Sequence, residues 1–170
     1  ETVTYTITDA SEIKFTGHKD IPLVGKGTKE GSFLTFEGTL ELKDNDPATL
    51  VMKGKVDMAS LTTDSEKLTE ALSSDAFFGS NNHADATFES KSVKKTDKGV
   101  DVTGDLTIKG KAVSVTFPAQ VKVEGDTITV QSAFQVNRQN WGIQYKGIFF
   151  KDKNIMDMAD LQWKLVGKKK

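Results

Sequence analysis

Apolar and polar residues alternate along most of the chain, and one segment interrupts that alternation. A period of two is typical of strands that turn one face to a core and the other to water. Turn-forming Gly, Asn, Asp and Pro residues separate the alternating regions, so we expect successive strands to form hairpins. The regions predicted to be strands are Thr2–Thr8, Glu12–Thr16, Phe36–Leu42, Leu50–Met58, Thr87–Val93, Val100–Ile108, Val113–Val123, Ile128–Val136, Ile143–Phe150 and Met158–Val166.

The interruption is the segment Met58–Ser90. Within it, Leu68 and Leu72 are one helical turn apart, and residues 63–66 read Thr-Asp-Ser-Glu, which has the form of a capping box. The sequence therefore predicts a helical crossover at about residues 63–79, which covers one end of an otherwise all-β structure.

Consecutive hairpins around a single helical segment favour an up-and-down antiparallel β-barrel of about eight strands. The apolar share of 36% suits antiparallel strands with one face in water. No linker or repeat divides the chain, so residues 1–170 are predicted to form one domain. A β-sandwich with Greek-key connections is the alternative. The segment His18–Gly31, rich in glycine and lysine, is predicted to be a long loop.

Small and large residues alternate on the predicted inward faces; Gly54, for example, lies between Met52 and Val56. Small residues either let strands bend where a barrel closes, or leave a lumen that accepts one apolar ligand. The pattern favours neither interpretation strongly. The candidate lumen residues are Phe36, Leu40, Met52, Val56, Phe88, Leu106, Ile108, Phe117, Phe134 and Val136.

The predicted crossover would close such a lumen with its apolar face. For the pair Phe77-Phe78, plain core filling is the alternative to a lid at the mouth of a pocket. The residues expected to close the pocket are Leu68, Leu72, Phe77 and Phe78.

Arg138 is the single arginine among 23 basic residues. Its planar guanidinium, with several donors, suits either of two roles. In the first, Asn137, Arg138 and Trp141 lie near the polar head of a ligand. In the second, Arg138 clamps a carboxylate or loop carbonyl groups and has a structural role. The sequence leaves both open.

Composition and motifs argue against catalysis. Without cysteine, the chain has no disulfide and no thiolate chemistry, and a net charge of -1 gives no reason to expect nucleic acid as a partner. His18 and His83 stand in separate segments, and no spacing suits a metal site. We therefore expect a binding protein without cofactor or metal. A structural barrel that binds nothing, or an enzyme acting on a lipid-like substrate, stays as an alternative.

Five segments together resemble a known family. They read GSFLTFEGTLEL (31–42), ASLTTDSEKLTEALSSDAFF (59–78), ATFES (86–90), VTGDLTIKGKAVSVTF (102–117) and VNRQNWGI (136–143), in the order expected for the YceI-like family. The resemblance implies a lipocalin-like extended antiparallel barrel, and an exported, usually periplasmic, protein. It also implies a long-chain ligand such as a polyisoprenoid, an isoprenoid quinone or a fatty-acid-like lipid. Whether the protein is a monomer or a homodimer stays open.

Overall fold

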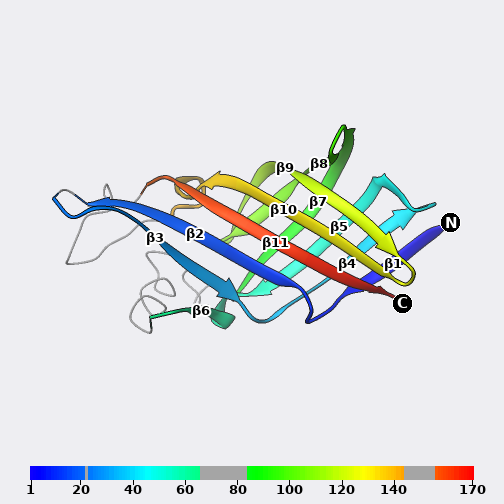
Figure 1. The fold of residues 1–170 in the computed structure, drawn as a ribbon, viewed down its shortest axis with the longest axis horizontal. Helices are drawn as coiled ribbons and strands as arrows, with labels where there is room; N and C mark the ends of the chain where they lie inside the picture. Colours follow the sequence, from blue (N-terminus) through cyan, green and yellow to red (C-terminus); the bar gives the residue numbers. More distant parts are fainter. Residues whose placement is uncertain (22, 66–83, 144–155) are drawn as a thin grey trace.

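The computed structural model describes residues 1–21, 23–65, 84–143 and 156–170. In these residues eleven strands form one antiparallel sheet, which curls round on itself (Figure 1). Two single-turn 3₁₀ helices, η1 and η2, follow β5 and β10. The elements are β1 (Thr2–Ile7), β2 (Glu12–Ile21), β3 (Gly25–Phe33), β4 (Phe36–Lys43), β5 (Asp46–Asp57), η1 (Met58–Ser60), β6 (Leu61–Thr63), β7 (Asp85–Thr96), β8 (Gly99–Ile108), β9 (Lys111–Glu124), β10 (Thr127–Asn137), η2 (Arg138–Trp141) and β11 (Met158–Lys169).

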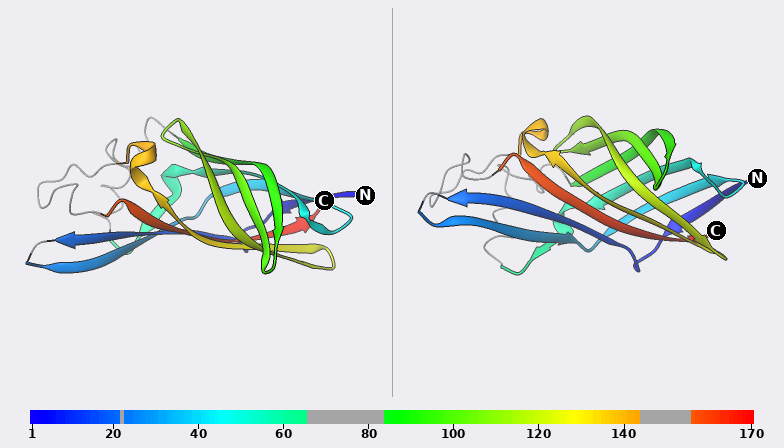
Figure 2. Two further views of the ribbon diagram at one scale, coloured as in Figure 1. Left: turned by 90° about the horizontal axis from the view of Figure 1, so that it is seen from above. Right: turned by 45° about the horizontal axis from the view of Figure 1, so that its top comes forward.

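Eight of these strands close a ring. Its order is β1-β4-β5-β7-β8-β9-β10-β11, and β11 pairs again with β1, where Tyr5 lies opposite Lys169. From β7 to β11 each strand neighbours the next one in the sequence, as in an up-and-down barrel. The predicted eight-stranded antiparallel barrel is confirmed, and the sandwich alternative is wrong. The views in Figure 2 show the twisted strands wrapping round the interior.

The predicted loop His18–Gly31 is instead part of a β-hairpin. β2 and β3 pair from Ile13–Phe33 to Ile21–Gly25, and the hairpin extends to the end of the molecule opposite both termini (Figure 1). Most residues near its tip are exposed on both faces, so the strands there carry no alternating apolar pattern. Its base is held more firmly, because β2 also pairs with β11 and β3 pairs with β6.

The predicted helical crossover falls mostly outside the described residues. At its start, Leu61–Thr63 form a strand, and the Thr63 hydroxyl donates to the Ser65 carbonyl at 2.7 Å. No α-helix occurs among the residues that the structure describes. The predicted strand Ile143–Phe150 also lies outside them, except for Ile143, which is not in a strand. The predicted pocket-closing residues outside the described part are Leu68, Leu72, Phe77 and Phe78.

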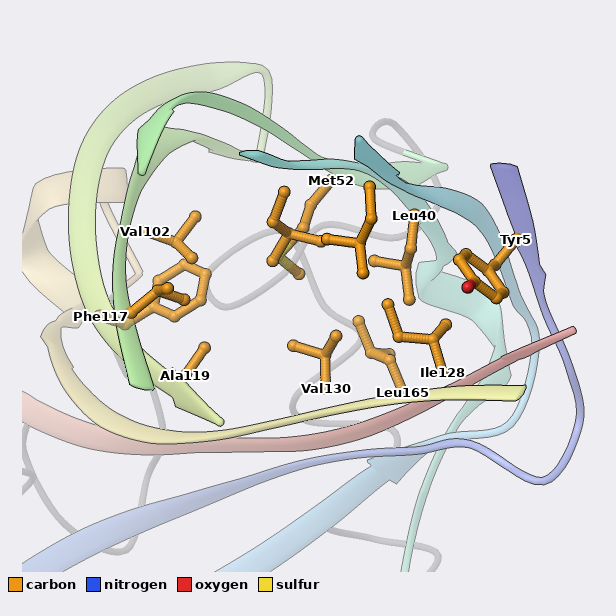
Figure 3. Packing of buried hydrophobic residues seen from close by; sticks show 12 residues of the cluster. Tyr5, Leu40, Met52, Val102, Phe117, Ala119, Ile128, Val130 and Leu165 are labelled. Atoms are coloured by element: carbon orange, nitrogen blue, oxygen red, sulfur yellow. The ribbon is translucent and has the colours of Figure 1, made fainter. Parts of the chain in front are cut away.

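Inward side chains form two buried clusters. The first includes Tyr5, Leu40, Phe117 and Ile128, all at most 2% exposed, whose side chains converge from strands around the ring (Figure 3). Each such apolar side chain stabilises the fold by about 1.5–3 kcal/mol relative to an exposed one. The second cluster gathers the base of the β2–β3 hairpin against β8 and η2. Its members are Phe15, Phe33, Met58, Leu61, Ala86, Leu106, Ile108, Trp141 and Ile143.

Candidate ligand-binding site

An apolar cavity of about 120 Å³ lies inside the barrel, and residues of both buried clusters line it. For scale, an engineered apolar cavity of about 150 Å³ in another protein binds benzene. The space therefore holds a short apolar group or one end of a longer chain. The predicted lumen residues that line it are Phe36, Leu40, Met52, Val56, Phe88, Leu106 and Ile108.

Three glycines on the inward faces have different surroundings: two meet close neighbours, and the third borders open space. A Cβ atom at Gly38 would overlap the Lys53 carbonyl oxygen, and one at Gly104 would lie 2.6 Å from Phe88 Cζ, so these two glycines permit close approach of neighbours. A Cβ at Gly54 would meet only the Glu37 carbonyl oxygen, at an ordinary 3.7 Å. Gly54 lines the cavity and leaves part of it open.

An aromatic cluster forms one wall of the interior. The ring of Phe117 stacks on Phe134 with centroids 4.7 Å apart, and Trp163 meets Phe117 and Phe134 edge-on at 5.0 and 5.1 Å. Trp163 and Phe88 line the cavity, whereas Phe117 and Phe134 lie behind them. Val136, also predicted to face the lumen, packs against the second buried cluster and does not line the cavity.

Asn137, Arg138 and Trp141 lie in and beside η2 and are not among the residues that line the cavity. Arg138 is buried and donates from Nε to the Met156 carbonyl at 3.0 Å and from Nη1 to the Ile143 carbonyl at 2.6 Å. Asn137 Oδ1 accepts the Gln139 amide at 3.0 Å. These contacts are those of the structural clamp. Contact of the three residues with a ligand stays a prediction.

Trp141 fixes η2 to the barrel wall, because its Nε1 donates to the Leu106 carbonyl at 2.9 Å. Phe15, Phe33 and Trp163 line the cavity but are not among the predicted lumen residues. Phe15 and Phe33, whose ring centroids are 5.8 Å apart, lie on β2 and β3, on either side of the segment His18–Gly31 that was predicted to be a loop. Trp163 lies on a correctly predicted strand, where its inward position follows from the alternation.

Asp160 and His18 interact on the outer face of the barrel. Asp160 neighbours the cavity-lining Leu161, so the two side chains point to opposite faces of β11. One Asp160 oxygen accepts from Gln135 Nε2 at 2.9 Å, and the other lies 2.9 Å from His18 Nε2. The hydrogen bonds from Gln135 and His18 hold the pKa of the Asp160 carboxyl below its ordinary value of 3.8. Within the described residues no group of three or more His, Cys, Asp or Glu could hold a metal ion.

Because the folded-state pKa of Asp160 is lowered, its contribution to stability is present above the ordinary pKa and is lost as the pH falls through the folded value. We expect Asp160→Asn to lower the free energy of unfolding at neutral pH by about 0.5 kcal/mol, since exposed fractions of 28% and 30% for the His18 and Asp160 side chains keep the effect small. Urea denaturation should show this difference shrinking as the pH falls below the ordinary pKa of 3.8. Asp97→Asn in an exposed turn is the control, and a difference independent of pH would contradict the prediction.

Comparison with known proteins places the chain in a family. A family model described as the YceI-like domain matches residues 5–166. The chain belongs to the YceI-like family. The match covers all eight strands of the ring, apart from a few terminal residues, so the family resemblance of the five sequence segments is confirmed.

Curated YceI-like relatives match part of the chain. Protein YceI of Escherichia coli O157:H7 is 33% identical over 96 residues, which are 56% of this chain and 50% of that protein. A UPF0312 protein of Staphylococcus aureus is 33% identical over 123 residues, 68% of this chain and 70% of the relative. The chain therefore spans about half the length of the YceI relatives that it matches.

Two solved structures share the fold. BcnA of Burkholderia cenocepacia matches with a TM-score of 0.80 and 23% identity, over 94% of this chain and 98% of that one. A polyisoprenoid binding domain from Saccharophagus degradans matches with a TM-score of 0.70 and 12% identity over the whole of both chains. At these identities the likeness shows the fold alone. No described helix of this YceI-like chain is long and apolar enough to cross a membrane.

Proposed function

We propose that this YceI-like barrel binds a long-chain apolar ligand in its interior and sequesters or carries it. Polyisoprenoids, isoprenoid quinones and fatty-acid-like lipids are the candidate classes. The observation that carries the proposal is the cavity, whose inward-facing side chains are aliphatic or aromatic and converge from strands around the ring. The description of the Saccharophagus degradans relative as a polyisoprenoid binding domain supports the same class of ligand.

Burial of apolar surface supplies the affinity. About ten methylene groups at roughly 0.8 kcal/mol each give a gross term of about 8 kcal/mol before the costs of association. A chain of that length exceeds the 120 Å³ of the cavity, so the interior must widen or the chain must extend past it. Phe36, Val56 and Phe88 line the cavity and are only partly buried, which gives the site room to adjust.

Binding without catalysis is the function that this geometry supports best. His18 bonds to Asp160 on the outer face, and neither residue lines the cavity. An enzyme would need an acid, base or nucleophile facing its substrate. The described lining places Lys14 and Lys55 at the wall, but their ammonium groups approach Glu12 and Glu37 at half-exposed positions.

Native mass spectrometry of the purified protein tests the proposal directly. We expect a species heavier than the chain by the mass of one lipid, or a 1:1 complex after addition of a prenyl alcohol or a fatty acid. Denaturation should release the bound molecule for identification. A barrel that carries nothing and binds none of the added chains would instead be the structural module.

An exported, periplasmic location would fit a lipid carrier of this kind, and we propose it for this protein. Fractionation of the source cells with an antibody against the barrel tests it. Recovery of the protein with the cytoplasmic markers would contradict the proposal.

A further inference from the structure

Two polar atoms on residues that pair across a ladder in the barrel interior lack hydrogen-bond partners. Among the described residues, the buried side-chain atoms without a partner are Trp163 Nε1 and Ser132 Oγ. The two residues lie opposite each other in the β10–β11 ladder. Both share the inward face with Phe134, which meets Trp163 edge-on. Buried polar groups without partners are uncommon in folded proteins, so an adjacent pair of them calls for a functional explanation.

Trp163 connects this pair to the cavity. Its side chain lines the cavity and is partly exposed, although Nε1 itself is covered. Ser132 is 5% exposed and lies across the ladder from it. Trp163 and Ser132 therefore lie next to the cavity wall that a bound lipid chain would contact. The cavity must widen to hold a long chain, and a displacement of the indole ring would open it toward both polar atoms.

The chemistry of the two groups selects an oxygen acceptor. An indole N–H only donates, and a serine hydroxyl can donate as well as accept. Two donors from residues that pair across the β10–β11 ladder suit a carbonyl or hydroxyl oxygen. Trp141 provides the contrast, because its Nε1 is already bonded to the Leu106 carbonyl and is not available to a ligand.

The charges near the cavity favour a neutral ligand end. Lys14 and Lys55 belong to the lining, but their Nζ atoms lie 4.0 Å from Glu12 and 3.5 Å from Glu37, and about half of each side chain is exposed. Lys53 is exposed as well. A phosphate or carboxylate in the interior would lose its water, while the lysines of the lining keep exposed side chains, and a neutral oxygen needs only the two donors.

We propose that Trp163 and Ser132 form a hydrogen-bonding subsite for the neutral, oxygen-bearing end of the ligand. The barrel then prefers chains that end in a carbonyl or hydroxyl over hydrocarbons and over phosphorylated chains of equal length. This inference rests on the proposed lipid-binding function and adds which end of the ligand enters and which residues recognise it.

Nuclear magnetic resonance of the indole groups separates the subsite from lipid binding in general. The chain has two tryptophans, so ¹H–¹⁵N spectra contain two indole N–H signals, which Trp163→Phe assigns. The lipid-stripped protein is titrated with dodecane, 2-dodecanone or dodecyl phosphate. We expect dodecane and the ketone to bind, the ketone alone to move the Trp163 signal downfield, and the Trp141 signal to stay in place.

If dodecane and the ketone both bind but give the same Trp163 signal, the proposed subsite is wrong. The proposed lipid-binding function is unaffected by that result. If native mass spectrometry detects no complex with any probe or added lipid, the proposed function fails and the subsite with it. Binding of dodecyl phosphate as tightly as the ketone also overturns the preference for a neutral end.

Variants give a second readout. Ser132→Ala and Trp163→Phe should each reduce the preference for 2-dodecanone over dodecane by about five- to tenfold, the range expected for a neutral hydrogen bond. Ser132→Ala removes an unpaired atom and should not lower the melting temperature of the empty protein. Ser114→Ala, at an exposed position of β9 outside the cavity lining, is the matched control, which should keep both that temperature and the ligand preference. A destabilised Ser132→Ala protein with unchanged preference would assign the hydroxyl a structural role and overturn the subsite.

Discussion

Replacement of Gly54 by valine is expected to weaken binding of a twelve-carbon chain about thirtyfold. A Cβ atom at this position meets only the Glu37 carbonyl oxygen, at 3.7 Å, so the valine methyl groups would occupy the cavity itself. Exclusion of two or three methylene groups from the barrel costs about 2 kcal/mol of binding free energy. Valine also suits a strand better than glycine, so the free energy of unfolding should stay the same or rise.

Titration with 2-dodecanone, followed by native mass spectrometry, measures the loss. Gly17→Val is the matched control, because a Cβ there has its nearest neighbour, the Lys29 carbonyl oxygen, at 4.0 Å and lies outside the cavity lining. Gly38→Ala should behave oppositely and lose about 1–3 kcal/mol of stability by overpacking against Lys53. Unchanged ligand affinity in a folded Gly54→Val protein would show that the ligand does not use this cavity.

Replacement of Arg138 by methionine is expected to lower the free energy of unfolding by about 3 kcal/mol. The change keeps much of the apolar stem but leaves the Met156 and Ile143 carbonyl groups without the donors that Nε and Nη1 provide. The Arg138 side chain is 6% exposed, so water replaces these donors poorly. Urea denaturation followed by tryptophan fluorescence measures the change.

Two further variants distinguish the structural clamp from a head-group contact. Lys122→Met, at an exposed ion pair with Glu124, should change stability little. Arg138→Lys should lose stability because an ammonium group cannot reproduce the fork of the guanidinium, and it should bind phosphorylated and neutral lipids with the same ratio as the parent protein. A selective loss of phosphorylated lipids would restore the head-group role for Arg138.

The alternation of apolar residues was sufficient to predict the ring of strands and much of its inner surface. Leu40 and Met52, predicted to share the lumen, are paired partners on β4 and β5 and line the cavity. A period of two specifies which face is buried, because a shift by one residue would expose every apolar side chain of a strand. The alternation could not specify which inward residues line the cavity. Phe117 and Leu40 both occupy inward positions of their strands, but only Leu40 lines the cavity.

The β2–β3 hairpin shows where local patterns fail. In its outer half, β2 and β3 pair only with each other, and most residues are exposed to water. Because no face has to be apolar there, glycine and lysine are tolerated. The inner half contributes Phe15 and Phe33 to the second buried cluster. Pairing of β2 with β11, at Thr16–Asp160, joins residues far apart in the chain, and a single sequence holds no signal for such a contact.

The contact that closes the ring also dictates when the barrel can be completed. β1 lies between β4 and β11, and its partners on β11 are Gly167–Lys169, far from β1 in the sequence. Contacts between such distant residues form late and slow folding, because the whole intervening chain must be ordered first. Until its β11 partners are in place, β1 keeps an open edge that another chain could pair with. The pairing of β1 with Gly167–Lys169 thus converts an open sheet into a closed barrel.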